Sequence, residues 1–344
     1  MNLPRLVTPV NKPKRCATLS HQTPMLLIGS CFTSNIGQRL AVDGFDVMQN
    51  PHGTLYNPIS IAQALSHILM REELSADRLY FDGTLWHSWQ HHGDFSSTSR
   101  EQCLLACRQA QDDAYHFLQR CHTLFITFGT AYVFSLVETG QVVANCHKAP
   151  ARLFERRRLT VEDIVCAWQP LLFLLPQNIR QIVFTVSPIR HMADGAHDNQ
   201  LSKSTLLLAV DQLTSQQDNG PNNTSFSSAV HNEPTEAAHN DTTAPERFYF
   251  PAYEILLDEL RDYRFYSDDL VHPSTVAIDI VYRRMQEYCM SQETVALAER
   301  VGNYRRLAQH RPLHPESSLT DQHRAKLRQL RLELEQELGR RLNF

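Results

Sequence analysis

The stretch Met25-Leu26-Leu27-Ile28-Gly29-Ser30-Cys31-Phe32 contains the turn that decides the fold. Residues 25–28 form an apolar run typical of a strand buried on both faces in a parallel sheet, and residues 33–40 are typical of a helix. A direct strand-to-helix turn directs a side chain out of the carboxyl end of the sheet, where open α/β folds bind ligands. We therefore expect Ser30 to be an exposed nucleophile. The alternative is that Gly29-Ser30 only caps the helix. The chain lacks the second glycine of Gly-x-Ser-x-Gly, so this is not the α/β-hydrolase turn.

The rest of the chain alternates between apolar runs and helical segments. Asn57 followed by Pro58 is a typical helix start, and Thr160 with Asp163 forms a capping box. This alternation predicts an α/β fold with a central parallel sheet of about five strands and helices on both faces. The further strands are predicted at residues 45–48, 123–128, 181–186 and 263–266.

A second chemical motif, Ser267-Asp268-Asp269-Leu270-Val271-His272-Pro273, precedes a predicted helix over residues 275–288. Asp269 and His272 are three residues apart, so one turn can bring the carboxylate to the imidazole. The carboxylate then fixes the tautomer that leaves the other ring nitrogen free to accept a proton from a serine. The alternative is that the aspartate merely caps the helix.

With these motifs in place, the chain resembles the GSCFA family of the GDSL/SGNH hydrolase superfamily. The resemblance covers residues 3–288 apart from one insertion. It implies a three-layer α/β/α sandwich, an SGNH-type serine esterase and substrates that are often acylated carbohydrates or lipids. The stretches that carry it, besides Gly29-Ser30-Cys31-Phe32 and Asp269-x-x-His272, begin at Asn50, Thr127, Ser187 and Tyr249 (Asn-Pro-His-Gly-Thr-Leu-Tyr-Asn-Pro, Thr-Phe-Gly-Thr-Ala, Ser-Pro-Ile-Arg-His and Tyr-Phe-Pro-Ala-Tyr-Glu).

The resemblance also implies where the oxyanion donors lie. The Ser30 amide is one expected donor, and Gly53 matches the superfamily's glycine after the second strand. The superfamily's asparagine after the third strand is replaced here by Gly129-Thr130, so Thr130 or Asn145 is the expected third donor. The alternative reading makes Gly53 a turn glycine and gives Asn145 only local turn bonds.

Three residues are expected to bind substrate. Arg190 and His191 follow the fourth strand at the same sheet edge, and a guanidinium there could hold an anionic or polyhydroxylated group. An equal alternative pairs Arg190 with Asp194 or Asp198. Trp86 lies in a predicted hairpin over residues 80–89 and could stack on a sugar ring, although core packing is the commoner role of tryptophan.

Composition sets limits on the class of protein. The 344 residues carry a formal net charge of −4, which gives no argument for binding nucleic acid or an anionic membrane. No segment approaches the ~20 apolar residues of a membrane helix, and residues 1–15 contain no apolar run of signal-peptide length. The eight cysteines include no Cys-x-x-Cys pair. We expect a cytoplasmic enzyme with reduced thiols.

The domain organisation follows from two segments that break the alternation. Residues 214–244 are polar and predict a disordered insertion within a hydrolase-like domain of residues 1–291. Residues 292–344 are predicted to form a helical extension, and its last helix could pack on the domain or on a second subunit to form a homodimer. That helix carries a stripe of leucines at positions 327, 330, 334 and 338.

Three alternatives to a serine esterase remain at this point. A metal could bind His87, His91 and His92, although no carboxylate-histidine spacing completes a zinc site. Cys31 could be the nucleophile, although we expect its thiol to point toward the helix or core. The fold could also serve a non-catalytic carbohydrate-binding or scaffold protein.

The function expected from the sequence is hydrolysis of short O-acyl esters, such as acetyl esters, through an acyl-enzyme on Ser30. His272 would act as general base and acid and Asp269 as its orienting group, with no metal or organic cofactor. An O-acyltransferase would use the same first half-reaction, with a sugar hydroxyl in place of water.

Overall fold

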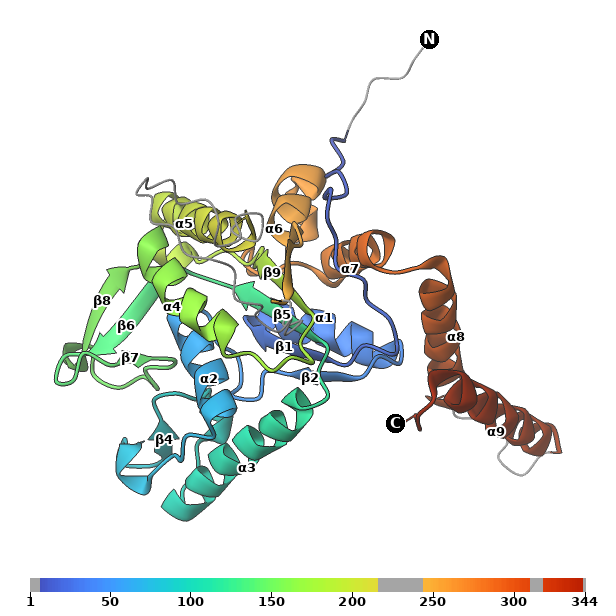
Figure 1. The fold of residues 1–344 in the computed structure, drawn as a ribbon, viewed down its shortest axis with the longest axis horizontal. Coiled ribbons are helices and arrows are strands. Elements are labelled where there is room, and N and C mark those ends of the chain that lie inside the picture. Colours follow the sequence, from blue (N-terminus) through green and yellow to red (C-terminus); the bar gives the residue numbers. More distant parts are fainter. Residues whose placement is uncertain (1–6, 216–243, 310–317, 343–344) are drawn as a thin grey trace, which may run out of the picture.

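The computed structural model describes residues 7–215, 244–309 and 318–342. Its centre is a five-stranded parallel sheet in the order β10-β9-β5-β1-β2 (Figure 1). The chain runs from β1 outward to β2 and then crosses to β5 on the other side of β1. The switch point, where such folds bind ligands, therefore lies between β1 and β5. The strands are β1 (Met25–Gly29), β2 (Val47–Gln49), β5 (Thr123–Phe128), β9 (Gln181–Val186) and β10 (Glu246–Tyr249).

Alternate residues of each strand serve two separate cores, because successive side chains in a strand point to opposite faces. Leu26 and Ile28 pack in a core with α2 (Pro58–Met70), α3 (Arg100–Leu118), α4 (Val161–Phe173) and α5 (Ala196–Ser215). Met25 and Leu27 pack in the other core with α1 (Cys31–Val42) and α7 (Thr275–Cys289). The molecule is thus the three-layer α/β/α sandwich expected from the sequence.

The predicted helix starts are confirmed. The Asn57 side chain accepts the Ser60 N–H at 2.8 Å to begin α2, and Thr160 and Asp163 form the capping box of α4. Both contacts satisfy backbone donors that have no partner within the helix.

The predicted strand at residues 263–266 is wrong. Tyr263–Phe265 form a 3₁₀ turn with Asp262 as its N-cap, whose side chain accepts the Arg264 N–H at 2.9 Å. The fifth strand is β10 instead. The strand β10 was not predicted from the sequence because it is a short edge strand that begins with two charged residues, Glu246 and Arg247.

Two small antiparallel sheets lie beside the sandwich. The predicted hairpin is confirmed as β3 (Leu79–Phe81) paired with β4 (Trp86–Ser88). The other sheet has the order β7-β6-β8, with β6 (Tyr132–Leu136), β7 (Val142–Val143) and β8 (Phe154–Arg158).

The chain ends in two helices, α8 (Gln292–Gln309) and α9 (Ser318–Leu338), at the opposite end of the molecule from β6–β8 (Figure 1). Leu334 and Leu338 of the predicted stripe pack against Val301 and Tyr304 of α8. The domain division at residue 291 and the homodimer stay predictions. The predicted insertion lies outside the described residues, except at its two ends. None of the helices in the described part of the chain combines the length and apolarity needed to span a bilayer.

Candidate active site

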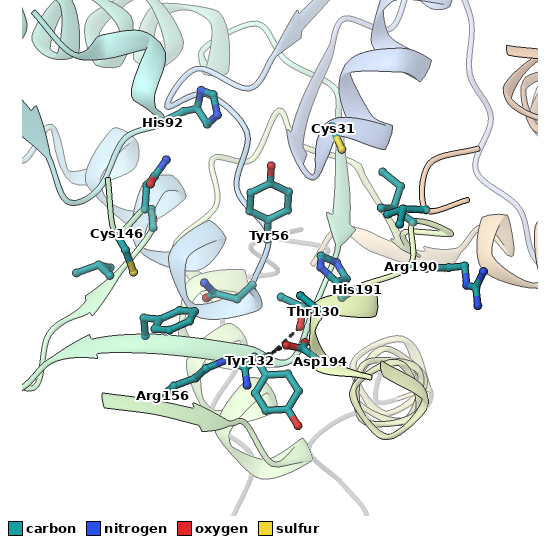
Figure 2. A pocket seen from close by; sticks show the side chains of 18 of the residues that line it. Cys31, Tyr56, His92, Thr130, Tyr132, Cys146, Arg156, Arg190, His191 and Asp194 are labelled. Atoms are coloured by element: carbon teal, nitrogen blue, oxygen red, sulfur yellow. Dashed lines mark hydrogen bonds and ion pairs between the residues drawn. The ribbon is translucent and has the colours of Figure 1, made fainter. Parts of the chain in front are cut away.

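A cavity of about 530 Å³ opens at the carboxyl ends of the central strands. Its lining comes from several parts of the chain, including Cys31 at the start of α1, Thr130 after β5 and His191 after β9 (Figure 2). His272, before α7, also lines it. Residues of β6, β7 and β8 also line it. Of the residues predicted to form the site, the cavity brings together Thr130, Asn145, Arg190, His191 and His272. It does not include Ser30, Gly53, Trp86 or Asp269 in its lining.

Asp269 and His272 form the predicted pair. His272 Nδ1 lies 2.6 Å from Asp269 Oδ2, while Asp269 Oδ1 accepts the backbone N–H groups of Val271 and His272 at 2.9 Å each. Hydrogen bonds from the His272 and Val271 amides, and then from the imidazole, lower the pKa of Asp269 to about 2. The carboxylate therefore stays ionised and fixes the ring with its proton on Nδ1, which leaves Nε2 as the available base.

The turn that carries this pair is stabilised by a backbone hydrogen bond within it and by two hydrogen bonds from Arg190. Ser267 donates its N–H to the His272 carbonyl at 2.7 Å, and Leu270 adopts a left-handed backbone with φ of +56°. Arg190 contributes twice, because its backbone N–H donates to the Val271 carbonyl at 3.2 Å and its side chain to the Leu270 carbonyl at 3.1 Å. Neither of the two roles predicted for Arg190, binding substrate or pairing with an acidic residue, includes this contact. Asp194, one of its two expected acidic partners, pairs with Arg156 instead (Figure 2).

Gly29 explains why β1 turns into α1 so tightly against β5. Its φ is +151°, and a Cβ at this position would lie 2.3 Å from the Thr127 carbonyl oxygen. Only glycine fits this close approach of two backbones.

Ser30 and Cys31, which follow Gly29, differ in their access to the cavity, and Ser30 is not exposed as predicted. Ser30 is the N-cap of α1 without a side-chain cap bond, and its Oγ is buried with no hydrogen-bond partner among the described residues. Cys31, which we expected to point toward the helix or core, lines the cavity (Figure 2). The expectation is correct in part, because the partly buried Cys31 side chain also packs against the core formed with α1 and α7.

The expected oxyanion donors are mostly engaged elsewhere. Gly53 donates its N–H to the Asn50 carbonyl at 2.7 Å in a turn, and Thr130 donates its N–H to Tyr56 at 3.0 Å. The Thr130 hydroxyl lies 3.1 Å from Ser202 Oγ. Asn145 accepts the His147 N–H through Oδ1, and no described residue accepts a bond from its Nδ2. Asn145 therefore keeps a donor for a bound group, whereas the amides of Gly53 and Thr130 are already used.

Trp86 and the clustered histidines have local partners. Trp86 packs against Phe81 of the hairpin and under the guanidinium of Arg100 of α3, and it does not line the cavity. His87 lies 2.9 Å from Asp82, and His91 lies 2.8 Å from Ser88. In the described part of the chain, no three histidine, cysteine or carboxylate side chains are grouped so that they could hold a metal ion.

Lys203, which was not predicted from the sequence as a site residue, is fully buried in α5. Its Nζ donates to the carbonyls of Gly129 at 2.6 Å and Ser187 at 2.7 Å, and so joins the segments that follow β5 and β9. Burial lowers the pKa of this ammonium to about 7, while a nearby Cys31 thiolate favours its charged form. A lysine on the same helical stripe as Leu206, Val210 and Leu213 was the available signal.

Two further cavity residues define its electrostatics. Burial, followed by the charge of Lys203, lowers the pKa of His191 to about 4, so this imidazole is neutral near pH 7. Arg156 of β8 lies over the Tyr132 ring, 3.9 Å from its centroid, and pairs with Asp194 (Figure 2). The cavity therefore has an aromatic wall with one guanidinium that is already paired.

Comparison with known protein families gives a match over most of the chain. The model of the GSCFA family matches residues 24–285, which include the whole parallel sheet and both ends of the site. No curated protein and no solved structure matches the chain.

Proposed function

The chain belongs to the GSCFA family, and we propose that it is a GDSL/SGNH-type hydrolase that cleaves short O-acyl esters through an acyl-enzyme. The observation that carries the proposal is the 2.6 Å contact between His272 Nδ1 and Asp269 Oδ2 at the rim of a cavity. A carboxylate that orients an imidazole beside a helix N-terminus is the arrangement that activates a hydroxyl or thiol nucleophile.

The reaction needs a nucleophile, a general base and hydrogen-bond donors for the oxyanion, and the chain has a candidate for each. His272 Nε2 removes the proton of the Ser30 hydroxyl, at the N-cap of α1, and later returns it to the leaving alcohol. The first amides of α1 and Asn145 Nδ2 are suited to hold the developing oxyanion. Water then attacks the acyl-enzyme and accepts the acyl group, which is released as the acid. Acyl transfer to a sugar hydroxyl would share the first half-reaction and stays an alternative prediction, as does a cytoplasmic location.

Replacement of the base tests the proposal. The change His272→Ala should lower turnover of p-nitrophenyl acetate by about 10³-fold or more, because the nucleophile loses its proton acceptor. The exposed His116 of α3 provides a matched control, and His116→Ala should retain activity. Equal activity in both folded variants would refute the proposed function.

A further inference from the structure

The side chain of Lys203 lies in the core of the molecule although it ends in an ammonium group. Lys203 belongs to α5 and is 1 % exposed. Its Nζ donates to the carbonyl oxygens of Gly129 at 2.6 Å and of Ser187 at 2.7 Å. These two residues directly follow β5 and β9, which are neighbouring strands of the sheet. One side chain therefore joins the two segments that leave the sheet at the edge where the cavity opens.

The segment after β5 lies against Ser30. A Cβ built on Gly129 would lie 3.5 Å from Ser30 Cβ. On its other side, the Gly129 backbone is held by the Tyr56 carbonyl, which accepts the N–H groups of Gly129 and Thr130 at 2.7 Å and 3.0 Å. The peptide backbone beside Ser30 is thus fixed through its N–H groups by Tyr56 and through its carbonyl by Lys203.

The segment after β9 supports the loop that carries the base. Three residues after Ser187, the Arg190 N–H donates to the carbonyl of Val271 at 3.2 Å. Val271 directly precedes His272 in the chain. Lys203 therefore holds the beginning of a segment whose other end contacts the His272 loop.

We propose that Lys203 is a positioning residue for the acyl transfer described above, because its two hydrogen bonds fix the backbone segments that contact Ser30 and the His272 loop. The inference rests on the proposed function. A nucleophile and its base must come within about 3 Å of each other for proton transfer, and a displacement of about 1 Å can cost about 10²-fold in rate. Lys203 does not line the main cavity, so it acts through these segments and does not touch substrate.

An ammonium suits this bridge because it can donate to two carbonyls at once, and charged donors make the stronger hydrogen bonds. Among the described residues no carboxylate forms an ion pair with Lys203, and its further contact is the Tyr253 ring, whose centroid lies 5.9 Å from Nζ. Burial lowers the pKa of the ammonium to about 7. The neutral amine still has two N–H donors, so both carbonyls keep a donor on either side of this pKa.

The test removes the ammonium and measures its coupling to the base. Lys203→Met should lower kcat for p-nitrophenyl acetate by about 10²-fold and change KM by less than about twofold, because the residues that line the cavity stay in place. In a His272→Ala background the same change should cost less than about threefold, because no base remains to be positioned. A purely structural role of Lys203 would cost the same factor in both backgrounds and would contradict the proposal.

Two further variants and a control accompany this measurement. Lys203→Arg keeps two donors, and a second cavity of about 210 Å³ beside Lys203 has room for the larger guanidinium. It should keep kcat within about tenfold of the unmodified chain. If Lys203→Met does not fold, Lys203→Gln takes its place. Its amide can donate to one carbonyl, so kcat should fall about tenfold, and this loss should also disappear in His272→Ala. Lys326→Met, at an exposed position of α9, should leave kcat unchanged.

Hydrogen exchange tests the bridge without ester turnover. In Lys203→Met the Arg190 amide should exchange about tenfold faster, and by more than the amide of Met285 in α7, which reports general loss of stability. A His272-dependent esterase whose kcat stays within about threefold in folded Lys203→Met would overturn the positioning role and leave the esterase function in place. If the unmodified chain turns over no ester, the proposed function fails. Faster exchange at Arg190 would then retain the role of Lys203 in holding the His272 loop, and unchanged exchange would overturn it.

Discussion

At the residue scale, the carboxylate and the imidazole of the site meet because a single turn separates Asp269 from His272. The spacing of Asp269 and His272 required only one turn, and the structure joins them at 2.6 Å. Ser30 and Cys31 are neighbours at a helix start, where a small change in backbone direction decides which side chain faces the cavity. The spacing of residues in the sequence does not predict which side chain faces the cavity, because this direction depends on how α1 packs against β5.

Asp269 should matter more than the adjacent Asp268. Both carboxylates lie near the histidine in the sequence, but only Asp269 bonds to its ring. The Asp269→Asn change would populate the wrong tautomer and should lower ester turnover by up to about 10⁴-fold, the loss seen for this change in a serine protease triad. The exposed Asp268→Asn is the matched control and should stay within about twofold. If Asp268→Asn were the more damaging of two equally stable variants, the assignment of the orienting carboxylate would be wrong.

At the element scale, four of the five strands were predicted, and three of them, β1, β5 and β9, are buried along their whole length, as near-continuous apolar runs in a parallel sheet are. The fifth was misplaced because an aromatic run at residues 263–266 resembles a strand, whereas β10 begins with charged residues at the sheet edge. The loop that follows residues 263–266 nevertheless reaches the site, because contacts from distant elements hold it. Arg190, after β9, is one such contact, and its role depends on tertiary packing that the local sequence does not show.

Arg190 should act by positioning the loop that carries His272. Loss of the 3.1 Å bond to the Leu270 carbonyl in Arg190→Ala should lower kcat about tenfold for both p-nitrophenyl acetate and the anionic p-nitrophenyl hemisuccinate. Arg190→Lys should recover part of the loss, since an ammonium can donate to the same carbonyl. A rise in KM restricted to the anionic ester would instead support the original prediction that Arg190 binds substrate.

At the scale of the whole molecule, the alternating pattern was sufficient to predict three layers, because each face of the sheet needs its own helices. It could not predict which polar side chains the layers would bury. His52 and His91 are buried with their rings stacked and the ring centroids 4.2 Å apart, and His52 has no hydrogen-bond partner on either ring nitrogen among the described residues. Burial lowers the pKa of His52 well below its ordinary value and that of His91 to about 3.

These two histidines should make the free energy of unfolding depend on pH below neutrality. Well above pH 6.5 both are neutral in the folded and unfolded chains, so they contribute no pH dependence there. As the pH falls from 6.5 toward 3, the unfolded chain takes up protons that the folded chain does not. Stability should then fall by up to about 1.4 kcal/mol per pH unit for each histidine. The slope, measured by urea unfolding between pH 5 and 6.5, should decrease by about one proton in His52→Phe but not in His116→Phe, whose side chain is exposed. A slope unchanged by His52→Phe would mean that this imidazole titrates equally in both states, contrary to its burial.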